Sequence, residues 1–115
     1  MDLEQINAMV EEYREAVENE LLMRLTLAEA EASAAYLKVT TLRDAYERGD
    51  IDGKNQKARD LQESAVLAAD GEYSDMLDHV STVKLTAEKA RVSREIEATR
   101  IGLVKAWLYS QGGTP

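Results

Sequence analysis

The sequence predicts an all-α fold: an elongated helical hairpin of a long helix, a short helix and a second long helix, assembled into a coiled-coil-like oligomer. Three observations predict it. The single proline is the last of 115 residues, and the six glycines are confined to a few places. Apolar residues recur at helical spacing along most of the chain. Hydrophobic residues make up 44% of the chain but include no Phe, which suits closely packed helices better than packed sheets.

The first helix is predicted over about residues 2–48, because neither glycine nor proline interrupts that segment. Apolar or small residues follow one another there at steps of three or four, at Leu3, Ile6, Val10, Tyr13, Val17, Leu21, Leu25, Ala28, Ala32, Ala35, Val39, Leu42 and Tyr46. A helix of this length spans about 70 Å at about 1.5 Å per residue. The rest of the chain is too short to cover it, so we expect a second copy to cover the remaining apolar stripe.

A glycine-rich turn, residues 49–53, ends the first helix. Gly49 suits the left-handed position that follows a helix, and Asp50 or Asp52 is expected to cap the next helix. That short helix is predicted over about 54–69.

A second turn at Asp70 and Gly71 precedes the last helix, which is predicted over about 72–109. Gly102 lies inside this helix and lowers its stability by about 1 kcal/mol relative to alanine. Residues 1–110 are predicted to form a single helical domain, and residues 111–115 a disordered tail.

The last helix carries two lines of apolar residues. The first line is Tyr73, Met76, Val80, Val83, Ala87, Ala90, Arg94, Glu97, Ile101, Val104 and Leu108, and the second is Leu85, Val92, Ile96, Leu103 and Trp107. Arg94 and Glu97 interrupt the first line. Either the buried face drifts around the helix and these two form a solvated salt bridge, or they are a buried polar pair that fixes register or lines a ligand site.

The net charge of −8 limits the classes of partner. Acidic residues dominate the first third of the chain, which disfavours general nucleic-acid binding. A membrane partner is not expected either, because interfacial helices usually carry basic polar faces. The chain has no cysteine and begins with an acidic segment rather than a signal peptide. Together these features favour a cytoplasmic protein.

The segment after Gly49 resembles two ligand-binding motifs but fits neither. A phosphate-binding P-loop needs four residues between its glycines and then Lys with Ser or Thr, whereas three separate Gly49 from Gly53 and Asn55 stands in the hydroxyl position. A calcium-binding EF-hand loop counted from Asp50 would need Glu at its twelfth position, where the chain has Leu61.

A less specific anion site remains at the start of the short helix, where free backbone amides and nearby bases favour negative charge. Its candidate residues are Gly53, Lys54, Asn55, Lys57 and Arg59. The alternative is a capped helix start with ordinary surface charges. Arg91 and Arg94 on the last helix, where bases outnumber acids, complete the candidate ligand-binding set.

No catalytic group or metal site can be assembled from the sequence. His79 is the single histidine and there is no cysteine, so a zinc site would depend on carboxylates. The paired carboxylates of residues 11–20 are expected on a solvated face, without a base, nucleophile and oxyanion donor around them. We therefore expect neither an enzyme nor a cofactor.

One segment resembles small helical proteins that tailed bacteriophages encode, a largely uncharacterised group. It runs from Leu42 to Arg59 and has the form Gly-x-Ile-x-Gly-Lys-Asn followed by Arg, beginning at Gly49. The resemblance implies action in the cytoplasm of a bacterial host. Some small, oligomeric helical phage proteins sequester host immune signals, including cyclic nucleotides, which is an analogy of class rather than of motif.

Two functions follow as hypotheses. In the first, the protein is a phage-type, non-enzymatic binding protein that sequesters a ligand, such as an anionic nucleotide-like immune signal in host counter-defence. In the second, it is a structural or adaptor coiled coil that binds a host or phage protein. The first requires bases from different copies to converge on a pocket, and the second requires an exposed apolar groove.

Overall fold

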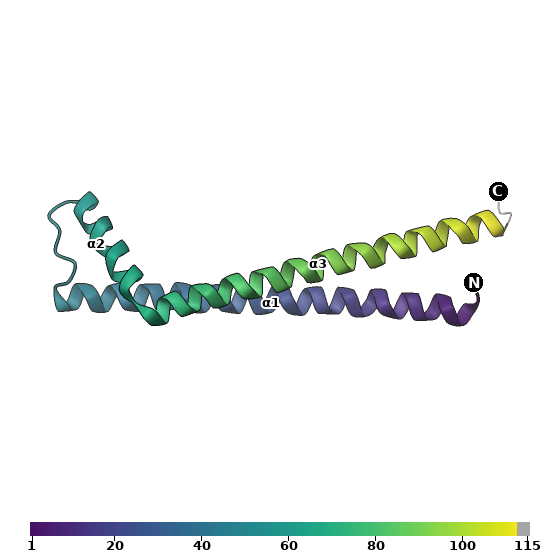
Figure 1. The fold of residues 1–115 in the computed structure, drawn as a ribbon, viewed down its shortest axis with the longest axis horizontal. Helices are drawn as coiled ribbons and strands as arrows, with labels where there is room; N and C mark the ends of the chain where they lie inside the picture. Colours follow the sequence, from purple (N-terminus) through teal and green to yellow (C-terminus); the bar gives the residue numbers. More distant parts are fainter. Residues whose placement is uncertain (113–115) are drawn as a thin grey trace. The chain divides into compact units, whose positions relative to one another are not determined.

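The computed structural model describes residues 1–112 and consists of three α-helices (Figure 1). They are α1 (Leu3–Arg48), α2 (Gln56–Ala69) and α3 (Gly71–Gln111). The described residues include no β-strand, so the predicted all-α class and the order long, short, long are confirmed. None of these three helices has an apolar stretch long enough to cross a membrane. Because α3 continues to Gln111, it includes the first residue of the predicted tail, and residues 113–115 lie outside the described part.

Packing divides the chain into two units that share both long helices. The terminal unit is Met1–Leu25 with the described part of Leu85–Pro115, and the central unit is Thr26–Lys84. The sequence predicted one domain over residues 1–110. No linker separates the two units, because α1 and α3 each continue from one unit into the other.

The helix ends follow from local hydrogen bonding. Gly49 has a φ of 81°, and the N–H groups of Gly49 and Asp50 donate to the carbonyls of Tyr46 and Ala45, which is the glycine-ended helix terminus that the sequence predicted. The predicted cap of the short helix was wrong. Asn55 caps α2 instead of Asp50 or Asp52, because its Oδ1 accepts the Ala58 N–H at 2.9 Å. The helix therefore begins at Gln56 rather than at residue 54.

Small residues form much of the buried core. In the central unit the buried apolar residues are Ala30, Ala34, Ala45, Ile51 and Val83, and in the terminal unit they are Ala87 and Ala90. Alanine has a short side chain, so helix backbones can approach one another closely at these positions. Ile51, in the loop before α2, is 4% exposed and anchors that loop to the helices.

The predicted first line of α3 is the line that packs. From Tyr73 to Val104 each of its members is buried or half-buried, including Arg94 and Glu97. The buried face therefore does not drift around the helix. In the terminal unit this face lies against the first half of α1, and the two helices run in opposite directions (Figure 1).

The apolar stripe predicted on α1 is mostly not its packed face. Val10, Val17, Leu21, Leu25 and Val39 are all exposed. The buried or half-buried line is instead Ile6, Met9, Tyr13, Ala16, Glu20, Met23, Leu27, Ala30, Ala34 and Leu37. Both lines have helical spacing. The buried line carries alanines and one member of a polar pair, described below, and these residues favour it for close packing.

Candidate functional site

The loop before α2 is closed by a glutamine side chain. The backbone N–H groups of Asp52 and Gly53 both donate to Gln62 Oε1, at 3.1 and 2.8 Å. Gln62 Nε2 in turn donates to Asp52 Oδ1 at 2.8 Å. Two amides at the predicted anion site are therefore already satisfied by this glutamine of α2.

Three of the predicted ligand-binding residues have structural roles in this loop. Gly53 lies so close to α2 that an added Cβ would be 2.8 Å from Ala58 Cβ and 2.9 Å from the Arg59 backbone nitrogen. Asn55 caps the helix. Arg59 donates from Nη1 to the Gly53 carbonyl at 3.2 Å and from Nη2 to Gln56 Oε1 at 3.3 Å. These contacts fit the alternative interpretation of a capped helix start.

Lys54 and Lys57 are different, because both side chains are exposed. Within residues 1–112 neither ammonium group forms an ion pair with a carboxylate. The two lysines are therefore the members of the predicted set around α2 whose charges remain available to a ligand.

The two predicted arginines of α3 belong to the terminal unit, whereas the α2 set belongs to the central unit. Arg91 is held between Glu88 and Glu95, and its Nη1 lies 2.6 Å from Glu95 Oε1. One positive and two negative charges make this group net acidic rather than basic. These contacts raise the pKa of Arg91, mainly through the hydrogen bond to Glu88.

Arg94 pairs with Glu20 of α1 rather than with Glu97, so the solvated salt bridge, one of the two alternatives, is not the arrangement observed. Its Nε donates to Glu20 Oε2 at 2.5 Å, across from α3 to α1. Glu20 is only 8% exposed. The hydrogen bond lowers the pKa of Glu20 and raises the pKa of Arg94. Of the two interpretations offered by the sequence, this contact is nearer to a buried polar pair that fixes register.

Sequence analysis missed Glu20, although a signal for it was present. Glu20 lies seven residues after Tyr13 and seven before Leu27, and both of these residues belong to the packed line of α1. A charged residue at a core-facing position of a heptad needs a partner across the interface. Arg94 interrupts the packed line of α3 in the same way and supplies that partner.

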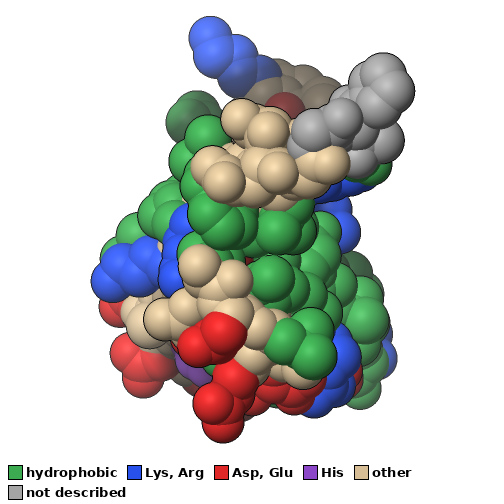
Figure 2. Space-filling model, turned by 90° about the vertical axis from the view of Figure 1, so that its right-hand side faces the viewer, with side chains coloured by type: hydrophobic (Ala, Val, Ile, Leu, Met, Phe, Trp, Pro, Cys, Tyr) green, Lys and Arg blue, Asp and Glu red, His purple; other side chains and the backbone are tan. Residues whose placement is uncertain are grey.

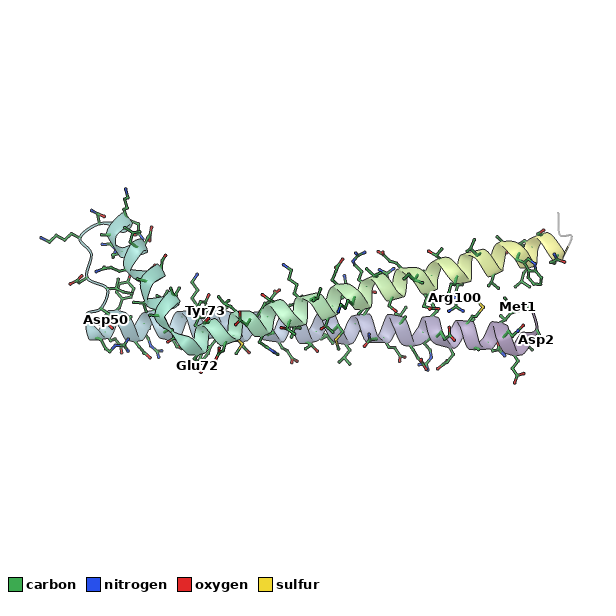
Figure 3. The ribbon with its side chains drawn as sticks, in the orientation of Figure 1. Met1, Asp2, Asp50, Glu72, Tyr73 and Arg100 are labelled. Carbon is green, nitrogen blue, oxygen red and sulfur yellow. The ribbon has the colours of Figure 1, made fainter. Side chains whose placement is uncertain are left out.

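A second ion pair links the same two helices. Arg100 Nη1 lies 2.8 Å from Glu12 Oε2 on α1 and 3.0 Å from Glu97 Oε2 on its own helix. Figure 3 shows Arg100 between the two ribbons. Glu12 and Arg100 are about half exposed, so this pair contributes less than a buried one would.

Large apolar side chains remain uncovered on both helices of the terminal unit. On α1 they are Leu3, Val10, Val17, Leu21, Leu22 and Leu25, and on α3 they are Leu85, Val92, Ile96, Leu103, Trp107, Leu108 and Tyr109. Figure 2 looks onto the end where both termini lie, and hydrophobic side chains occupy much of that surface. Exposed apolar surface of this extent is typical of a protein-binding face.

The terminal unit also has an apolar hollow of about 220 Å³, lined by Ile6, Met9, Val10, Ile101, Val104, Lys105 and Leu108. It lies where the start of α1 and the end of α3 meet.

In the central unit His79 is exposed and lines a shallow hollow with Glu29 and Met76. Across residues 1–112, no three His, Asp or Glu side chains are arranged to hold a metal ion.

Comparison with known proteins gave no further assignment: no protein-family model, no curated protein and no solved structure matches the chain. The described residues present two features on which a function can be proposed. They are the exposed apolar lines of the terminal unit and the exposed side chains of Lys54 and Lys57.

Proposed function

We propose that this protein is a non-enzymatic binding protein that works as an assembly of copies, in the manner of a structural or adaptor coiled coil. The observation that supports this function is the uncovered apolar line on each helix of the terminal unit. Exposing so many large apolar side chains to water is unfavourable, and covering them with another helix removes that cost. A protein partner, or a second copy, is the natural cover for a helical face.

The charged residues support a binding role rather than catalysis. Arg14 and Arg91 are each held by two carboxylates of their own helix. All of these side chains are substantially exposed, unlike the desolvated groups of most active sites. They are best explained as helix-stabilising surface pairs.

The experiment that tests this function is measurement of mass by light scattering at micromolar concentration. The protein should have at least twice the 12.8 kDa mass of one chain. Ile96→Asp places a charge in the exposed line of α3 and should lower that mass while the helical circular-dichroism signal persists, because Ile96 is 55% exposed within one chain.

Asn19→Asp is the control, since it adds the same charge to an exposed polar position of α1, outside the α3 line. It should leave the mass unchanged. A well-folded wild-type chain that stays monomeric at these concentrations would overturn the proposed assembly.

A second candidate function is sequestration of a phosphate-bearing signal, supported by the exposed and unpaired charges of Lys54 and Lys57. It also rests on the resemblance to phage proteins, which would place the protein in the cytoplasm of a bacterial host and give it a counter-defence role. Several copies would have to bring these lysines together, because a single loop supplies two exposed charges and a helix start that is already capped.

A further inference from the structure

The second apolar line of α3 lies on the face opposite to the one that packs on α1. Its residues Leu85, Val92, Ile96 and Leu103 each follow a packed residue by two positions, namely Val83, Ala90, Arg94 and Ile101. Two residues of an α-helix turn through about 200°. The α1 segment of the same unit therefore cannot cover this line. The four side chains are 41–67% exposed.

The spacing of this line is that of a coiled-coil seam. Steps of seven, four and seven residues place Leu85 and Val92 at one core position of the heptad, and Ile96 and Leu103 at the other. Thr99 and Lys89 fill the remaining core positions between them. A single lysine in such a seam lowers stability but specifies how two helices align.

The charges that flank the seam determine which direction of pairing is favourable. Glu95 precedes the core residue Ile96, and Arg100 follows the core residue Thr99. These four residues line a shallow hollow along α3 together with Val92. In a parallel pair of helices, a residue in the position of Glu95 meets the residue five places further along the other helix.

We propose that a second copy of this chain packs its own α3 on this line, parallel and in register. Glu95 of each copy then meets Arg100 of the other, once on each side of the seam. An antiparallel pair would instead bring the glutamates at positions 88 and 95 of the two copies together, with like charges opposed. This inference rests on the proposed self-assembly and specifies its interface.

The intrachain partners of these two residues do not prevent the pairing. Glu95 is paired with Arg91, and Arg100 with Glu12 and Glu97, but the Glu95 and Arg100 side chains are 51% and 44% exposed. Exposed pairs of this kind hold their partners weakly. Both groups can therefore turn toward a second helix, or be shared with it.

Cysteine cross-linking tests the direction and register, because the chain has no cysteine of its own. Thr99→Cys and Leu85→Cys place thiols in the seam two heptads apart, and Lys105→Cys places one at an exposed position on the side of α3 away from the seam. A parallel, in-register pair brings like positions together. Both seam variants should then form disulfide-linked dimers at least about tenfold faster than Lys105→Cys, because thiols held together react at an effective concentration near millimolar.

An antiparallel pair can bring at most one position opposite itself. Cross-linking of only one seam variant, or only of a mixture of the two, would therefore overturn the parallel arrangement. Cross-linking of neither, with the wild-type mass still at least that of a dimer, would overturn the α3 interface but not self-assembly. A monomeric wild type would overturn the proposed function itself.

Charge exchange gives an independent test. Glu95→Arg alone and Arg100→Glu alone should each lower the mass, because each opposes like charges across the seam. An equimolar mixture should restore it, since every contact between unlike copies is then attractive. A defect in folding would persist in the mixture, so a restored mass supports the Glu95–Arg100 contact. An unrestored mass would count against that contact.

Discussion

Arg94 of α3 holds the buried carboxylate of Glu20 of α1, with 2.5 Å between Arg94 Nε and Glu20 Oε2. The two residues are 74 positions apart in the chain. They meet because each lies on the packed line of its own helix, among alanine and half-buried apolar residues. Sliding one helix by a turn would leave both charges in the interface without partners, so this pair fixes the register of α1 and α3 in the terminal unit.

Removing one member of the pair should be worse than removing both. Arg94→Met leaves the Glu20 carboxylate in an apolar interface without its partner, whereas Arg94→Met with Glu20→Met replaces the pair by apolar side chains of similar size. We expect a clear fall in the thermal midpoint for Arg94→Met and a substantial recovery for the double variant, as measured by circular dichroism. A double variant that melts as low as Arg94→Met would show that the two residues act independently.

The same pair predicts a pH dependence. The folded-state pKa of Glu20 lies below its ordinary value of about 4.5, mainly because of the hydrogen bond from Arg94. The stability that ionised Glu20 contributes is therefore fully present above about pH 4.5 and is lost as the pH falls through the lowered pKa. The difference in thermal midpoint between wild type and Glu20→Gln should be constant from pH 6 to 7 and shrink below pH 4.5. A difference that grew on acidification would contradict this sign.

Two glycines should respond in opposite directions to the same substitution. Gly53→Ala places a Cβ against Ala58 and the α2 backbone and should destabilise the fold by about 1–3 kcal/mol, as overpacking does. Gly102→Ala adds a Cβ inside α3 with nothing within 4 Å and should stabilise the fold by roughly 1 kcal/mol. Urea unfolding of both variants measures these changes. Equal effects would show that the close approach at Gly53 is unimportant.

Replacement of Lys54 and Lys57 together by Ala tests ligand sequestration. If a phosphate-bearing signal binds there, calorimetry should show affinity that weakens with added salt. Two charge-assisted hydrogen bonds at roughly 1.5–3 kcal/mol each predict at least a tenfold loss in the double variant. Helicity and mass should not change. Normal binding by the double variant would exclude these lysines from the site and direct attention to Arg91 and Arg94.

The absence of catalysis is itself a prediction. Nucleotides incubated with the purified protein should remain chemically intact, and any that bind should be recovered unchanged after denaturation. Chromatography of the supernatant measures both quantities. Turnover that a single carboxylate substitution abolishes would show that the protein is an enzyme.

The candidate site could be predicted in part. Gly53, Asn55 and Arg59 were predicted to bind a ligand, and each is engaged in the structure of its own loop. Gln62, which accepts the N–H groups of Asp52 and Gly53, lies a helical turn or more beyond the loop. No short sequence motif connects a glutamine at that distance to two backbone amides. The Arg94–Glu20 contact was missed for a similar reason, because it requires the register of two helices to be known.

Local features of the sequence determined the three helices. Continuous helical spacing without glycine or proline predicted α1, and Gly49 predicted its end. The apolar spacing of α3 predicted its packed line. These properties depend on backbone preference and on periodicity within one segment, so residues near in the chain are sufficient to determine them.

Only the tertiary structure decided which face of α1 packs. The line through Val17 and Leu21 and the line through Ala16 and Glu20 have the same helical period, so periodicity could not choose between them. The choice depends on contacts with α3, where small residues such as Ala87 and Ala90 permit close approach and Arg94 compensates the charge of Glu20. The larger Val17 and Leu21 side chains remain exposed, because the line that carries Glu20 matches α3 in both size and charge.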